Sequence, residues 1–289
     1  MGKKRFFDDR LKYLSFIQNT SEKRAISSEL TPFIASMPQN RTFLRILDAG
    51  TGDGTVKSNV IKTFHKYHPY TSLLITGKEI SYEDLKNTLE KMPDRFVEHP
   101  NLLVTMTNVK FAELGHVENA NKIKNKKVKV HNLILKEDNS FDFHLQINKL
   151  NNFIKKNWGI EIDNKSRTSY SNPCLIRIYR EDHKRYLEPF IDNDYENNNY
   201  DLIIASQAYR AASAVKTKVN NVIAPLMRLL NKSGRLLVTH SCGEDTVEKI
   251  LKIAYKDKKP FPNKAKDIID FLKNNPVGEN SRYAFSKPK

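Results

Sequence analysis

The chain has few cysteines and glycines and no long apolar run. Its 289 residues include 2 cysteines and 10 glycines. Cys174 and Cys242 are too few for a disulfide framework or a cysteine metal set, so we expect a reducing cytoplasm and no metal. Because no apolar stretch of membrane-spanning length follows the first basic residues, we expect neither a membrane span nor a secretory signal.

The chain also has fewer acidic than basic residues. The chain carries 49 Lys and Arg against 33 Asp and Glu, a formal net charge of +16. The excess is spread along the chain, with local clusters only at 122–129 (KIKNKKVK) and 249–266. A basic chain attracts nucleic acid without specificity, but neither cluster is interleaved with the aromatic residues of a single-strand platform. A nucleic-acid partner is therefore an alternative to a small-molecule partner.

Three of the glycines fall within five positions, in DAGTGDGTV (48–56). The apolar run before them, Phe43 to Leu47, predicts a buried strand, and the apolar residues after them recur at helical spacing. A glycine turn between strand and helix places free N–H groups beside a backbone that a ligand can approach closely. Thr55 replaces the third glycine of a dinucleotide fingerprint, and no Gly-Lys-Ser/Thr phosphate loop follows. An ordinary tight turn is the plain alternative.

The spacing Asp48-x-Gly50-x-Gly52-x-Gly54 resembles the first motif of the class I S-adenosylmethionine-dependent methyltransferases. The resemblance implies S-adenosylmethionine as the cofactor. It also implies that the methionine part of the cofactor lies against five residues of the turn: Asp48, Gly50, Thr51, Gly52 and Gly54.

Two further cofactor contacts follow from the next predicted strands. Glu79 comes just after the apolar run Leu73 to Ile75, where a carboxylate can accept hydrogen bonds from both ribose hydroxyls, with Ile80 beside it. After the next strand, 101–109, the family commonly has an Asp that meets the adenine amino group. Asn108 is the nearest candidate here, since its amide oxygen can accept the same bond.

Candidate catalytic residues follow the fourth and fifth predicted strands. SQAY (206–209) resembles, without its two prolines, the Asn/Asp/Ser-Pro-Pro-Tyr signature of family members that methylate amino groups. The resemblance implies that Ser206 contacts the cofactor and acceptor and that Tyr209 packs on a planar or cationic acceptor; a partly buried helix-start tyrosine is equally compatible. His240, after the strand in NKSGRLLVTH, is a candidate base near neutral pH or a packing residue.

The predicted fold is α/β: a doubly wound, mostly parallel sheet of the Rossmann-like methyltransferase type, with an inserted α+β subdomain between the third and fourth strands. We expect an N-terminal helical segment at 1–42, a cofactor-binding domain at 43–109 and 200–289, and an acceptor-binding lid at 110–199. Within the insertion, IYREDHKRY (178–186) is either a grip for an anionic acceptor, through Arg180 or Arg185, or a solvated helix face. Beyond the fifth strand, only 281–285 could add a strand.

The sequence therefore predicts a cytoplasmic S-adenosylmethionine-dependent methyltransferase acting on a small molecule, with nitrogen as a candidate methylated atom. A compact inserted lid would close a small pocket, and the positive charge is diffuse. The alternatives are methylation of nucleic acid or another macromolecule, and a catalytically silent cofactor-binding module. The intact acid and glycine set argues against the silent module. The oligomeric state is left open.

Overall fold

A computed structural model describes most of the chain. Residues 1–20 of the expected N-terminal helical segment and Cys242 lie outside the described residues. The described ranges are 21–117, 121–162, 168–191, 199–206, 208–241, 261–275, 277 and 283–288.

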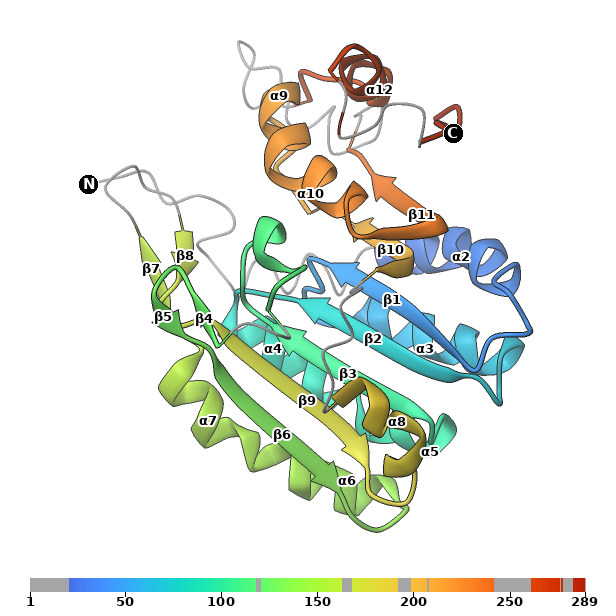
Figure 1. The fold of residues 1–289 in the computed structure, drawn as a ribbon, viewed down its shortest axis with the longest axis vertical. Coiled ribbons are helices and arrows are strands. Elements are labelled where there is room, and N and C mark those ends of the chain that lie inside the picture. Colours follow the sequence, from blue (N-terminus) through green and yellow to red (C-terminus); the bar gives the residue numbers. More distant parts are fainter. Residues whose placement is uncertain are drawn as a thin grey trace.

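A seven-stranded sheet in the order β11-β10-β1-β2-β3-β9-β6 forms the centre of the molecule (Figure 1). Five strands are parallel to one another; β9 runs antiparallel to β3, and β6 runs parallel to β9. The bounds are β1 (Phe43–Ala49), β2 (Ser72–Lys78), β3 (Leu102–Thr107), β6 (Lys129–Leu135), β9 (Cys174–Arg180), β10 (Tyr200–Ser206) and β11 (Leu230–Thr239).

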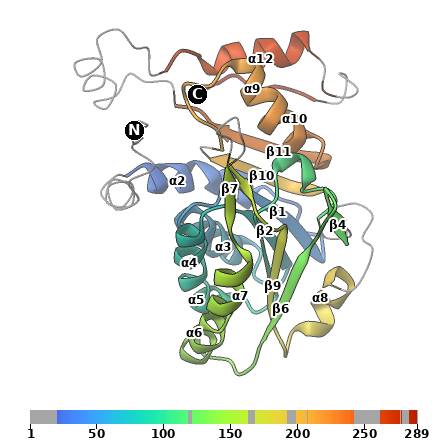
Figure 2. The same ribbon diagram turned by 90° about the vertical axis from the view of Figure 1, so that its left-hand side faces the viewer.

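Helices cover both faces of the sheet, as the two views show (Figures 1 and 2). One face carries α2 (Glu22–Ala35), α3 (Thr55–Tyr67), α4 (Tyr82–Glu90), α5 (Pro93–Glu98), α6 (Ser140–Asn148) and α7 (Leu150–Asn157). The other face carries the short turn η2 (Phe111–Glu113), α8 (Lys184–Ile191), α9 (Val215–Lys218), the π-helical turn η3 (Val219–Ile223) and α10 (Ala224–Met227). Helix α12 (Ala265–Asn274) packs outside this layer.

Neighbouring residues of one strand enter different cores. Ile46 packs into the core beneath α3, whereas Leu47 packs into the core on the opposite face, and both are fully buried. Strands covered on both sides read as near-continuous apolar runs, which is why the sequence located them. The doubly wound, mostly parallel α/β class with an insertion between its third and fourth parallel strands is confirmed.

The insertion joins the central sheet through β6 and β9. Strand β9 pairs with β3 and so satisfies backbone groups that a bare sheet edge would expose. Two ribbons, β4 (Lys122–Ile123) with β5 (Lys126–Lys127) and β7 (Ile160–Ile162) with β8 (Thr168–Tyr170), stand at the end where the parallel strands finish (Figure 1). Whether the insertion acts as a lid stays a prediction.

The expected strand at 281–285 is wrong for the part of it that the structure describes, since 283–285 have no regular structure. The extra strands lie instead at the β3 edge, where the insertion supplies them. No helix in the described ranges combines the length and the apolarity needed to cross a membrane.

Candidate functional site

The turn after β1 is built from three glycines in left-handed conformations. Gly50, Gly52 and Gly54 have φ angles of 94°, 57° and 78°, a region that other residues enter at a cost. Gly54 also precedes the first residue of α3, and a methyl group there would lie only 2.7 Å from the Cα of Thr88. The turn therefore requires glycine for its backbone conformation and, at Gly54, for space as well.

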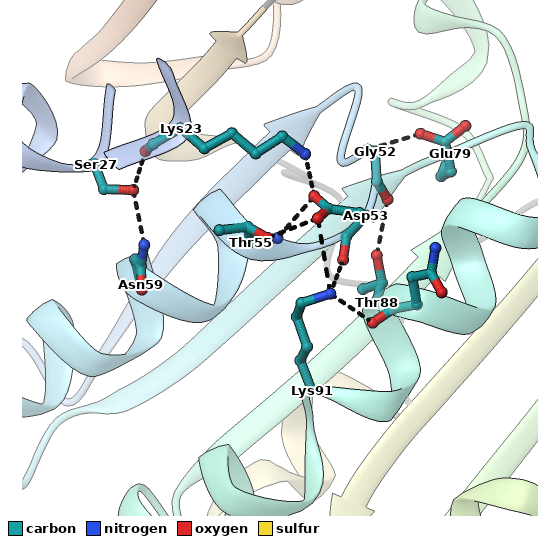
Figure 3. Close-up of polar contacts among 10 residues, drawn as sticks. Lys23, Ser27, Gly52, Asp53, Thr55, Asn59, Glu79, Thr88 and Lys91 are labelled. Carbon is teal, nitrogen blue, oxygen red and sulfur yellow. Dashed lines mark hydrogen bonds and ion pairs between the residues drawn. The ribbon is translucent and has the colours of Figure 1, made fainter. Parts of the chain in front are cut away.

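The carboxylate of Glu79 ties the glycine turn to the end of β2 (Figure 3). One oxygen accepts the N–H of Gly52 at 2.8 Å, and the other accepts the N–H groups of Ile80 and Ser81 at 2.7 and 2.8 Å. Glu79 is only 8% exposed. The carboxylate oxygen that faces Gly52 accepts a hydrogen bond from one amide N–H, so it keeps a lone pair for a further donor. That this donor is a ribose hydroxyl of the cofactor stays a prediction.

Asp53 holds the outer side of the turn to two helices (Figure 3). Its carboxylate pairs with Lys23 of α2 and accepts the hydroxyl of Thr55 at 2.7 Å, while Lys91, just after α4, donates to the Asp53 carbonyl at 2.7 Å. Burial alone would raise the pKa of Asp53, but the hydrogen bond and charge of Lys23 outweigh it and lower the pKa below its ordinary value. These bonds fix the turn from both sides.

Asp48 and Lys57 are two charged residues buried beneath the turn. Asp48 is 2% exposed and, among the residues that the structure describes, its Oδ2 has no hydrogen-bond partner, whereas Lys57 is fully buried and its ammonium donates to the sulfur of Met106 at 3.2 Å. Burial raises the pKa of Asp48 to about 6 even though the charge of Lys57 opposes this, and burial lowers the pKa of Lys57 to about 8 against the charge of Asp48.

The sequence interpretation missed Lys57. The available signal was its place on the apolar stripe of α3, one turn before Ile61 and two before Phe64, both fully buried.

Asn108 lies at the carboxyl end of β3, as expected, but its amide is engaged by the insertion. Its nitrogen donates to the carbonyl of Asn172 at 2.9 Å, and its oxygen accepts the N–H of Cys174 at 2.8 Å. The side chain is 1% exposed. Asn108 therefore anchors the turn that leads into β9, and its contact with adenine stays a prediction.

The three candidate catalytic residues lie near the other side of the turn. Ser206 ends β10 half-buried, and a methyl group at Gly50 would lie 3.8 Å from its carbonyl oxygen. The hydroxyl of Tyr209 lies 3.3 Å from Nδ1 of His240, whose Nε2 lies 2.8 Å from the carbonyl oxygen of Asn263. Because a carbonyl only accepts, Nε2 carries the proton, and in a neutral ring Nδ1 accepts from the phenol. Burial raises the pKa of Tyr209 to about 12, which keeps the phenol protonated.

The cluster at 179–185 lies away from this site. Arg180 ends β9, which runs antiparallel to β3, so it lies at the opposite end of the sheet from the glycine turn. It is 6% exposed, pairs with Asp182 and donates to the carbonyl of Phe96 at 3.2 Å. The expected solvated helix face is wrong for Arg180, whose guanidinium is buried at the far end of the sheet, but correct for Arg185, which is exposed on α8. A grip on an anionic acceptor stays a prediction.

Several solved structures are similar to this chain, and two of them are described below. No family model and no curated protein matches the chain. MNMC2 from Aquifex aeolicus aligns with 10% identity and a TM-score of 0.29, over 84% of this chain and 61% of that chain. The rRNA methyltransferase AviRa from Streptomyces viridochromogenes aligns with 10% identity and a TM-score of 0.27, over 73% of this chain and 71% of that chain. With both TM-scores below 0.5, the fold and the site rest on this chain's own geometry.

Proposed function

We propose that the chain is an S-adenosylmethionine-dependent methyltransferase. The observation that carries the proposal is the hydrogen bond from Gly52 N–H to the Glu79 carboxylate. It holds the first two predicted cofactor motifs, the glycine turn and the acid after β2, next to each other. The residues fit the group: within the described ranges Oδ2 of Asp48 is buried without a hydrogen-bond partner, and the glycines leave the turn open to close approach. Asp48 and the turn would hold the methionine part and Glu79 the ribose. The bound cofactor would supply an electrophilic methyl group.

The chain's own part in such a reaction is to orient the acceptor, exclude water and remove a proton. In-line displacement gains most from orientation. Tyr209 donates its proton to His240, so its oxygen is free to accept a hydrogen bond from an N–H or O–H of the acceptor. As the acceptor loses its proton to this oxygen, the phenol proton passes to Nδ1 of His240, and the resulting imidazolium keeps its Nε2–H bond to Asn263.

For the acceptor, the structure gives more support to nucleic acid than to a small molecule. The small-molecule expectation rested on a compact lid, but β6 and β9 of the insertion belong to the central sheet. Beside the carboxyl end of β3 the insertion forms instead an open hollow of about 310 Å³. Its lining includes three lysines, and the full set is Lys110, Lys124, Lys126, Glu161, Ile162, Ser169 and Tyr170.

The lysine hairpin, which we define as β4, β5 and the turn 124–125, has unbalanced positive charge. Lys124 pairs with Glu113 at 3.0 Å and Lys126 with Glu161 at 3.0 Å. Lys122 and Lys127 are exposed and lie directly opposite each other across the hairpin. Like charges directly opposite are destabilising, and an anion between them would relieve the repulsion. A phosphate backbone has the matching chemistry.

The first experiment measures methyl transfer. The purified chain is incubated with methyl-labelled S-adenosylmethionine and, separately, with total RNA, DNA and a small-metabolite extract. We expect label in a nucleic-acid fraction, and a Tyr209→Phe variant as control should transfer much less. Label found only in the small-metabolite fraction would favour the small-molecule acceptor, and no label in any fraction would count against the enzyme.

The second experiment tests the lysine hairpin by RNA binding at several salt concentrations. Lys122→Gln with Lys127→Gln removes two charges and leaves both ion pairs of the hairpin intact. Each lost phosphate contact should lower the salt slope by about one. The control, Lys62→Gln with Lys149→Gln, removes two exposed lysines, one on α3 and one between α6 and α7, and should leave the slope unchanged. Equal slopes for both variants would remove the hairpin from the acceptor site.

A further inference from the structure

We propose that Lys57 is a positioning residue whose buried ammonium keeps the Asp48 carboxylate charged beneath the glycine turn, ready for the cationic end of the cofactor. The inference rests on the proposed function and extends it to a residue with no cofactor contact of its own. It predicts that removing the ammonium weakens cofactor binding through Asp48.

Space for the ammonium is created by Gly77, the second-last residue of β2. A methyl group at Gly77 would lie 2.6 Å from Nζ of Lys57 and 2.7 Å from both the Met106 sulfur and the Thr51 hydroxyl. Gly77 is also the residue directly opposite Asp48 in the pairing of β1 with β2. The side chain of Lys57 therefore extends from α3 to Gly77, the residue of β2 that pairs with Asp48. A glycine within a strand commonly marks such a close approach.

Hydrogen-bonding capacity is left over on both partners. The Lys57 ammonium has three donors, and its bond to Met106 uses a thioether, a weak acceptor. Oδ2 of Asp48 accepts no hydrogen bond from any residue that the structure describes. Burying charged groups is costly unless opposite charge or a ligand compensates them. If residue 57 only filled the core, methionine or leucine would do so without the cost of a buried charge. The presence of a lysine therefore indicates that the charge has a function.

The charges around Asp48 explain why a counter-ion is needed. Lys57 from α3, Glu79 after β2 and Lys23 from α2 all act on it. Glu79 and burial raise the pKa of Asp48, whereas the two lysines lower it, Lys57 more strongly. Without the Lys57 ammonium, the largest influence that lowers the pKa of Asp48 would be gone, so this pKa would rise further and the carboxyl would take up a proton more readily.

The first test is calorimetric titration with S-adenosylmethionine from pH 5.5 to 8.5. The wild-type affinity should fall as Asp48 takes up a proton, with a midpoint set by its pKa of about 6. For Lys57→Met the midpoint should move upward by about 1 to 3 pH units, the usual effect of losing a close opposite charge. Lys62→Met, an exposed position on the same helix, should leave the midpoint in place. A Lys57→Met midpoint equal to that of wild type would overturn the inference.

The second test needs no cofactor and so separates this inference from the proposed function. Urea unfolding of Lys57→Met, Asp48→Asn and the double variant measures the coupling of the pair. The double variant should lose less stability than the two single losses together, because it leaves no unpaired buried charge. If Lys57→Met alone does not fold, a folded double variant supports the pairing. Additive losses, or an unfolded double variant, would refute it. A wild-type chain that binds no S-adenosylmethionine refutes the proposed function instead.

Discussion

Replacing Gly54 by alanine should destabilise the chain through two separable costs. The left-handed backbone at φ 78° costs a non-glycine residue about 1–2 kcal/mol. The added methyl group would lie 2.7 Å from the Cα and 2.9 Å from the Cβ of Thr88, and overpacking of this kind costs about 1–3 kcal/mol. The free energy of unfolding should therefore fall by about 2–5 kcal/mol. Backbone atoms cannot rotate away, so the overpacking cost cannot be avoided cheaply.

Gly52→Ala is the matched control in the same turn. Gly52 has a φ of 57°, but the nearest atom to its added methyl group is Nζ of Lys23 at 3.7 Å, so only the backbone cost of about 1–2 kcal/mol applies. Urea unfolding can be followed by the fluorescence of Trp158, the single tryptophan, which is 3% exposed. Equal losses in the two variants would show that Thr88 does not crowd Gly54. No loss in either would refute the left-handed turn.

Three further predictions concern the site and its support. Glu79→Ala removes the expected acceptor of the ribose hydroxyls and should weaken S-adenosylmethionine binding by about 1.5–3 kcal/mol in calorimetry; unchanged affinity would contradict its role. Burial lowers the pKa of His99 from 6.5 to about 4, because the folded chain favours the neutral ring. The free energy of unfolding should therefore be highest above about pH 6.5 and should fall by about 3 kcal/mol as the pH drops towards 4. The free energy of unfolding of His99→Gln should depend less on pH over this range than that of wild type. An equal pH dependence would show that groups other than His99 cause it. Tyr209→Phe should reduce kcat in the methyl-transfer assay while cofactor affinity stays within a few tenths of a kcal/mol; a loss of affinity alone would place Tyr209 on the cofactor side.

The parallel part of the fold was predictable because its strands are buried on both faces. Apolar runs of this kind, such as Leu73 to Ile75, are visible without knowledge of their neighbours. The pairing of β9 with β3 was not predictable, since the residues of one strand do not by themselves show which strand it pairs with. Residues 110–199 were expected to form a separate inserted subdomain, yet β9 within them continues the main sheet.

For the candidate site, the glycine turn was predictable, whereas the engagement of particular side chains was not. All three glycines have the positive φ that their spacing suggested. Asn108 occupies the expected strand end, but the turn at 172–174 that takes up its amide comes from a distant part of the sequence. The burial of Lys57 was not predicted, because it depends on the room left by Gly77, which lies on β2 and not on the helix of Lys57.

Calorimetric titration of the purified wild-type chain tests the central claim most directly. S-adenosylmethionine and its demethylated product should each bind in a saturable manner at one site per chain, and NAD should bind more weakly than either. The reason is that Thr55 stands where a dinucleotide turn needs its third glycine, while Asp48 and Glu79 remain in place for the amino-acid and ribose parts. Tighter binding of NAD, or no binding of S-adenosylmethionine at millimolar concentration, would contradict the account.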